Sequence, residues 1–252
     1  LLSRRQRQMC IRDSVWTDYV EYLDSISGAT MDIQKQIEVF AQNRDKWATD
    51  IDFADEQYKF TLADLDMDGQ VELLVSHSGG TGFFTYTSFY NVDKNGKLKE
   101  LNTTFSEYDS QPDLMDQVSD ESDVIVYSNI INGKGYYNYI VYDLMKESPS
   151  SYVYRVSSLA IVDDVVTETK LAVEYETYDG PDYEATISYE DYNGAELTEE
   201  EYHSYAASYY VAQQASEHRA HFKWIDVSDI VDVSDAEAAQ ILMESYDTYS
   251  FH

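Results

Sequence analysis

The sequence predicts an α+β fold, with a central, mostly antiparallel β-sheet and helices at the N- and C-terminal ends of the chain. Helical spacing of apolar residues is confined to the two ends, whereas the middle is a series of segments in which apolar and polar residues alternate. Strands grouped between helices are typical of α+β rather than of alternating α/β folds. With three prolines and no Ser/Gly-rich linker, residues 15–252 form one predicted domain.

Four helices are expected, two near each end. Apolar residues recur on one face over 15–23 and again over 31–47, where Ile33, Ile37 and Phe40 point inward and Thr30 is a candidate cap. Towards the C-terminus, Thr198 with Glu201 forms a capping box that opens a helix to about residue 216. A second capping box, over 234–237, opens a helix to about residue 246.

The strands are rich in Val, Ile, Thr and aromatic residues, and turn residues separate them. Asn95-Gly96 predicts a hairpin, and Asp163-Asp164 marks another turn. The expected strands cover residues 58–63, 71–76, 83–92, 97–101, 124–130, 135–142, 152–162, 165–178 and 184–189.

The first fourteen residues, LLSRRQRQMCIRDS, break with the rest of the chain. They hold four arginines and the single cysteine, Cys10, whereas the sequence after them is acidic and tyrosine-rich. The string resembles translated sequencing-adaptor text at the ends of fragmentary metagenomic reading frames, and the alternative is a genuine basic arm. We therefore expect residues 1–14 to be non-native, and any export signal or lipid-anchor cysteine to have preceded this segment.

The charge restricts the partners. Forty-eight acidic residues against 17 basic ones give a formal net charge of −31. Such a surface repels nucleic acid and anionic membranes, so metal cations and basic surfaces are the better partners. No apolar run is long enough to cross a membrane. Without Cys10 the chain has no thiol for disulfides, thiolate metal sites or nucleophilic catalysis.

Residues 64–72 read D-L-D-M-D-G-Q-V-E and predict a calcium-binding loop between two strands. Asp64, Asp66 and Asp68 can place three carboxylates around one point, and the glycine after them allows the backbone to reverse. Gln70 supplies a backbone carbonyl oxygen and Glu72 a further carboxylate. Six or seven hard oxygen ligands suit Ca²⁺ better than Mg²⁺.

The spacing resembles a known class of extracellular calcium loops. An EF-hand needs a bidentate Glu at the twelfth position, which here is Val75. The closing acid at position nine is similar to the D-x-D-x-D-G-x-x-D/E loops of FG-GAP and VCBS-type repeats, with Glu72 where Asp is frequent. Most of residues 30–225, including the run FTLADLDMDGQVELLVSHSGGTGFFTYTSFYNV, is also similar to a group of uncharacterised envelope proteins of anaerobic bacteria. The resemblance implies fold and compartment, and no reaction.

No catalytic constellation is evident in the sequence. Residues 76–82 are followed by a strand rather than the helix that a phosphate loop requires, and His218 and His221 are expected to be solvated at a helix end. We therefore expect a non-catalytic, calcium-binding interaction domain that is secreted or held at the cell envelope, with a cell-surface protein or glycan as partner. The alternative is a carbohydrate-binding or carbohydrate-active module that uses exposed members of the 24 tyrosines.

Overall fold

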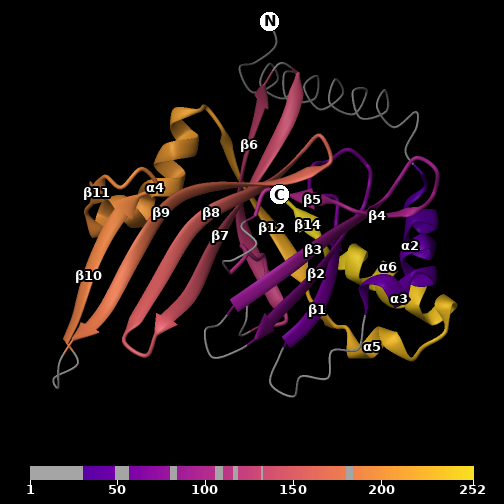
Figure 1. Cartoon of the computed structure of the whole chain (residues 1–252). Coiled ribbons are helices and arrows are strands. Elements are labelled where there is room, and N and C mark those ends of the chain that lie inside the picture. The colour runs from indigo at the N-terminus through magenta and orange to yellow at the C-terminus, as the bar shows by residue number, and fades with distance from the viewer. Residues whose placement is uncertain are drawn as a thin grey trace, which may run out of the picture.

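A computed structural model describes residues 31–48, 57–79, 84–105, 110–115, 119–131, 133–179 and 184–252. Residues 1–14 and the helix predicted over 15–23 lie outside the described residues. The described part is mostly antiparallel β-sheet with a few helices, in agreement with the predicted α+β class (Figure 1). No helix in these ranges is long and apolar enough to cross a membrane.

The smaller sheet contains the predicted loop. Its five strands lie in the order β13-β1-β2-β3-β4, and consecutive neighbours pair antiparallel. The strands are β1 (Gln57–Ala63), β2 (Glu72–Gly79), β3 (Phe84–Val92), β4 (Leu98–Glu100) and β13 (Ile225–Asp226). Because Ala63 pairs with Glu72, residues 64–71 form the connection between two central strands.

The larger sheet has nine strands, with the main order β11-β10-β9-β8-β7-β6-β12-β14 and β5 pairing parallel with β9. The strands are β5 (Asn102–Thr103), β6 (Glu121–Ile131), β7 (Lys134–Ser148), β8 (Ser151–Val162), β9 (Val165–Asp179), β10 (Glu184–Asp191), β11 (Glu196–Leu197), β12 (Ser216–Lys223) and β14 (Ser250–Phe251). The predicted turn at Asp163 and Asp164 joins β8 to β9, with φ values of 53° and 60°.

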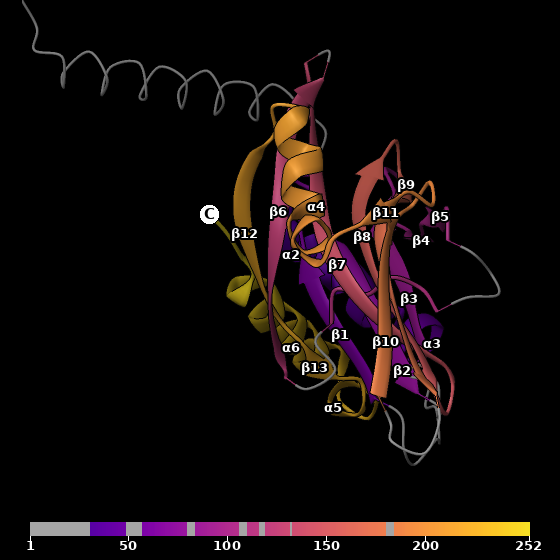
Figure 2. The ribbon, with the colours of Figure 1, turned by 90° about the vertical axis from the view of Figure 1, so that its left-hand side faces the viewer.

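The helices are α2 (Ile33–Gln42), α3 (Arg44–Trp47), α4 (Glu199–Ala212), α5 (Ser228–Val231) and α6 (Asp235–Thr248). In Figures 1 and 2, α4 lies on the outer side of the larger sheet, whereas α2, α3, α5 and α6 gather at the smaller sheet. Both predicted capping boxes lie at helix starts, and at Thr198 the reciprocal bonds with Glu201 are both present.

Three hydrophobic cores hold these layers together. One lies between the two sheets and includes Leu74, Tyr139 and Phe222. Another joins the far face of the smaller sheet to α2 and α6, and a third packs α4 on the far face of the larger sheet. The smaller sheet is therefore covered on both faces, which explains why Leu73 and Leu74 are both fully buried although they point in opposite directions.

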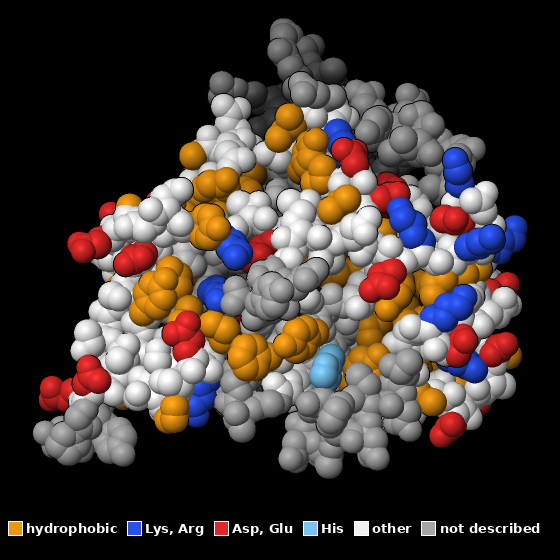
Figure 3. Space-filling view, viewed as in Figure 1, with side chains coloured by type: hydrophobic (Ala, Val, Ile, Leu, Met, Phe, Trp, Pro, Cys, Tyr) orange, Lys and Arg blue, Asp and Glu red, His pale blue; other side chains and the backbone are white. Residues whose placement is uncertain are grey.

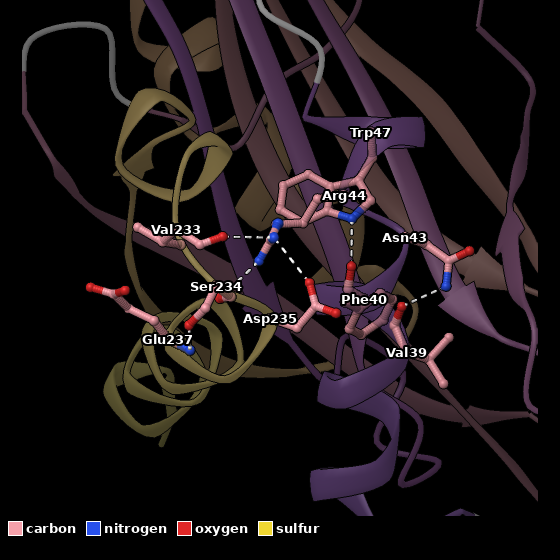
Figure 4. Close-up of polar contacts among 9 residues, drawn as sticks. All are labelled: Val39, Phe40, Asn43, Arg44, Trp47, Val233, Ser234, Asp235 and Glu237. Carbon is pink, nitrogen blue, oxygen red and sulfur yellow. Dashed lines mark hydrogen bonds and ion pairs between the residues drawn. The ribbon is translucent and has the colours of Figure 1, made fainter.

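Polar contacts fix the helices against each other at the smaller sheet (Figure 4). The Arg44 guanidinium donates hydrogen bonds to the carbonyls of Val233, at 2.9 Å, and Ser234, at 3.2 Å, and lies 3.0 Å from a carboxylate oxygen of Asp235. Trp47 Nε1 donates to the Phe40 carbonyl at 3.0 Å. Arg44 thus binds the chain where it enters α6, although the two segments lie far apart in the sequence.

Some sequence expectations are wrong. The N-cap of α2 is Asp32 rather than Thr30, and the helix predicted over 31–47 is divided at Asn43. His218 and His221 lie on the strand β12 rather than at a helix end, because α4 ends earlier than predicted and Gln214 turns the chain with φ at 60°. His218 Nε2 is 2.8 Å from the Ser128 hydroxyl, and His221 Nδ1 is 3.0 Å from a carboxylate oxygen of Asp123. Each histidine contacts a residue of β6, and because the two lie three residues apart on one strand, their side chains point to opposite faces.

Candidate metal centre

The loop between β1 and β2 makes a tight reversal. Met67 and Gly69 both have positive φ, at 58° and 84°. Glycine adopts this region without steric cost, whereas methionine does so only when its surroundings hold it there. A backbone held in this way brings the side chains before and after the reversal towards one another.

Two carboxylates organise the loop from inside. The backbone N–H groups of Asp68 and Gly69 donate to the two carboxylate oxygens of Asp64, at 3.1 and 3.0 Å. The Leu65 N–H donates to Glu72 Oε2 at 2.8 Å, and Glu72 is only 2% exposed. Buried carboxylates are costly unless they are paired with donors or with a cation.

Asp64, Asp66 and Glu72 converge on one point. One carboxylate oxygen from each lies within 4.8 Å of the others. Two ligand oxygens on opposite sides of a calcium ion are about 4.8 Å apart, since each Ca–O distance is about 2.4 Å. The three oxygens are therefore close enough to bind a single ion. Asp66 Oδ1 is buried without a hydrogen-bond partner among the described residues, as expected of a carboxylate oxygen that serves as a metal ligand.

The electrostatics of the cluster are unfavourable without a cation. Burial, with repulsion from Asp68, raises the pKa of Asp64 to about 7. Burial, with repulsion from Asp68 and Asp64, raises the pKa of Asp66 to about 7 as well. The pKa of Glu72 is raised well above its ordinary value, mainly by burial and then by repulsion from Asp66 and Asp64. A divalent ion would remove this repulsion.

Asp68 and Gln70, the other two predicted ligands, lie beside the cluster. The carboxylate of Asp68 accepts hydrogen bonds from the backbone N–H of Gln70 at 2.7 Å and from its side-chain amide at 2.8 Å. Asp68 is therefore engaged by its neighbour, while its charge still acts on Asp64 and Asp66. Gln70 stays a predicted ligand through its backbone carbonyl.

Sequence reasoning missed three residues that support the loop. Gln36 of α2 is 1% exposed; its side-chain amide donates to the Gly69 carbonyl at 3.2 Å and accepts from the Val71 N–H at 2.8 Å. The Tyr139 hydroxyl donates to the Leu65 carbonyl at 3.0 Å, and the Tyr249 hydroxyl donates to that of Asp64 at 3.3 Å. A glutamine on the inward face of α2 indicates that its side chain has a buried hydrogen-bond partner. The contacts of the two tyrosines cannot be predicted from the residues next to them in the sequence.

No known protein family, curated protein or solved structure matches the chain. The resemblance to FG-GAP and VCBS-type loops therefore rests on the residues of the loop alone.

Proposed function

We propose that this chain is a calcium-binding, non-catalytic domain that acts outside the cytoplasm or at the cell envelope, and that the ion locks the β1–β2 loop. The observation that carries the proposal is the convergence of Asp64, Asp66 and Glu72 around an unpartnered Asp66 oxygen. Asp68 and the Gln70 carbonyl complete the proposed ligand set. Millimolar calcium outside cells is sufficient for loops of moderate affinity.

The anchoring of the loop at both ends favours a structural ion over a catalytic one, although residues 66–70 are half-buried. Glu72 is buried, Leu65 is 4% exposed and Val71 is fully buried, while α2 and two tyrosines contact the loop backbone. A catalytic ion needs an open coordination position next to a substrate cavity. The described cavities are lined by other residues.

Thermal unfolding with calcium, magnesium or a chelator tests the proposal. Binding to the folded state alone stabilises by RT ln(1 + [Ca²⁺]/Kd), which is about 0.4–1.4 kcal/mol at millimolar calcium for a Kd of ~10⁻⁴–10⁻³ M. The melting temperature should therefore rise by a few degrees, and magnesium should do much less. Gln70→Ala should keep most of the effect, because a backbone carbonyl is the proposed ligand there.

Asp66→Asn gives a sharper test because it changes the stability without calcium and the gain with calcium in opposite directions. Without calcium the variant should be more stable than the parent protein, since one of the repelling charges is gone. Calcium should add little to the stability of the variant, because a ligand is lost. Asp229→Asn, an equal charge change at an exposed position on α5, should shift both conditions alike. Absence of calcium binding by calorimetry, or an unchanged calcium effect in Asp66→Asn, contradicts the proposal.

A carbohydrate-binding role is the second candidate, and a groove on the larger sheet favours it. The groove has a volume of about 220 Å³ and is lined by Arg155, Lys170, Tyr175 and Tyr192 over an apolar floor. The two tyrosines are 39% and 63% exposed, and Lys170 Nζ lies 5.7 Å from the ring centroid of Tyr192. Aromatic faces beside hydrogen-bonding groups suit a sugar ring.

A β-bulge builds this groove. Lys170 and Tyr175 are an odd number of residues apart, so a regular strand would point them to opposite faces. The pairing of β8 with β9 shifts register between Val156 and Ser157, and the extra residue brings both side chains to one face. Figure 3 shows hydrophobic side chains with Lys or Arg between them over these strands. Loss of neutral-hexasaccharide binding in Tyr192→Ala, but not in Tyr142→Ala, would support this role.

A further inference from the structure

The strands β6 and β7 stop pairing in the middle of the larger sheet. Their ladder runs from Ile131 and Lys134 to Val126 and Tyr139 and ends there. Yet β6 continues back to Glu121 and β7 continues to Ser148. Figure 2 shows the two strands diverging below this point, with β1 visible between them. A sheet that is continuous at one end is therefore split at the other.

The split leaves two strand edges that face each other. On its other side, β6 pairs with β12 over residues 121–128, and β7 pairs with β8 over residues 139–148. Among the described residues, no strand pairs with the inner edges of these two segments. Unpaired edges present backbone N–H and C=O groups to any chain that can reach them.

A cavity of about 490 Å³ occupies the split. Its walls are residues 122–125 of β6 and 140–144 of β7, and its floor includes Asp113, Leu114 and Met115. At about 3.3 Å per residue, walls of this length match a peptide of four or five residues in extended conformation.

The charges that line the cavity favour a basic occupant. Among the described residues, Asp113, Asp123 and Asp143 line it with one cation, Arg219, while His221 contacts Asp123 from beside the cavity. Burial raises the pKa of Asp113 to about 6, and burial raises that of Asp143 to about 6 although Arg155 opposes the shift. Both carboxylates therefore lack full compensation, which a lysine or arginine side chain of a ligand would provide.

Asp113 is poorly suited to act as a catalytic acid here. Its carboxylate accepts hydrogen bonds from the Ser76 hydroxyl and, at 2.9 Å, from the Met115 N–H. It is 8% exposed, so it contributes charge to the floor rather than a free group for proton transfer. Asp113 and Asp143 are thus better suited to recognising a cation than to catalysing hydrolysis.

We propose that the cleft between β6 and β7 binds an extended peptide segment of a partner protein, with alternate basic side chains, by adding it as a strand between the two open edges. Main-chain hydrogen bonds to both edges supply affinity, and alternate side chains supply specificity, as in other cases of β-strand addition. One basic side chain faces Asp113 and Asp143 in the cavity, and the apolar residues on either side of it point to the opposite face of the sheet. The inference does not rest on the proposed calcium site.

The test uses the full chain and a pool of acetylated, amidated heptapeptides with Lys at alternate positions and Val, Thr, Leu or Tyr between them. Calorimetry should detect binding at physiological salt. The same pool with Glu in place of Lys should not bind. Alternate N-methylation of the backbone keeps the charge but removes the edge hydrogen bonds, so it should weaken binding at least about tenfold.

Variants locate the peptide. Asp143→Asn should weaken binding about tenfold or more, whereas Asp229→Asn, an equal charge change on α5, should leave it unchanged. If the N-methylated pool binds as tightly as the unmethylated pool, charge alone accounts for the interaction and the proposal is overturned. No binding at millimolar peptide would overturn it as well, and so would displacement of the peptide by a neutral hexasaccharide, which would assign the cleft to a sugar.

Discussion

The contact between Gln36 and the calcium loop leads to a prediction that the fold alone does not make. Gln36 lies on α2, and its side chain joins three backbone groups: the carbonyls of Met31, at 2.7 Å, and Gly69, at 3.2 Å, and the N–H of Val71, at 2.8 Å. The last two flank Gln70, whose carbonyl is a proposed calcium ligand. Gln36 therefore fixes the backbone of the loop from the outside.

Replacing Gln36 by leucine keeps the side chain buried and close in size but removes all three hydrogen bonds. The main cost is the N–H of Val71, a residue that is fully buried. A buried donor left without a partner costs about 1–3 kcal/mol, and the two carbonyls add less because Met31 and Gly69 are only half-buried. We expect Gln36→Leu to lower the free energy of unfolding by about 2–3 kcal/mol. For a chain of this size the melting temperature should fall by about 4–10 °C.

Gln42→Leu is the matched control, because Gln42 lies on the same helix but is exposed. It should change the free energy of unfolding by no more than about 0.5 kcal/mol. Thermal and urea unfolding, each with and without calcium, are the measurements. Gln36→Leu should also reduce the calcium-dependent gain, because the Gln70 carbonyl is no longer held. Equal stabilities of the two variants would show that the contact does not support the loop.

Three further predictions concern other contacts. In the parent protein, the raised pKa of Asp113 means that this carboxyl favours the folded state only while it is protonated. The free energy of unfolding of the parent should therefore fall by about 3 kcal/mol as pH rises from about 4 to about 6. Asp113→Asn lacks this titration, so it should gain stability relative to the parent over the same interval. The check is denaturant unfolding of both proteins at several pH values across this range, or potentiometric titration of the folded and unfolded states. Arg44→Ala should cost about 1–2 kcal/mol, because the Val233 carbonyl loses its donor. Thr198→Ala should cost about 1 kcal/mol, seen as a lower urea midpoint, because the capping box with Glu201 is lost.

Local pattern accounts for most of the strands and for the loop. Each of the nine expected strands has a counterpart in the structure, because alternation and turn chemistry are properties of short segments. Spacing predicted that Asp64, Asp66, Asp68 and Glu72 surround one point, and the structure brings together Asp64, Asp66 and Glu72 but not Asp68. Whether calcium binds there remains a prediction.

The features that sequence reasoning missed depend on neighbours far along the chain. The helix α4 ends where Gln214 adopts a left-handed conformation, which glutamine rarely signals, so β12 was mistaken for the end of a helix. The alternation of Ala220 and Phe222, both fully buried, was the available clue. The divergence of β6 from β7 has no local signature at all, since each strand keeps its alternation while their pairing stops.

Tyr139 links the two proposed sites. It is the last residue of β7 that pairs with β6, so it marks the apex of the cleft, and its hydroxyl donates to the Leu65 carbonyl in the calcium loop. If calcium orders the loop, it should therefore also rigidify β7 at Tyr139, where β6 and β7 diverge. Linkage requires that calcium and a peptide in the cleft then strengthen each other's binding by the same factor. Tyr139→Phe keeps the buried ring and removes only the hydroxyl, so it should abolish this mutual effect while each ligand still binds alone. A peptide affinity that is the same with calcium and with chelator in the parent protein would show that the two sites act separately.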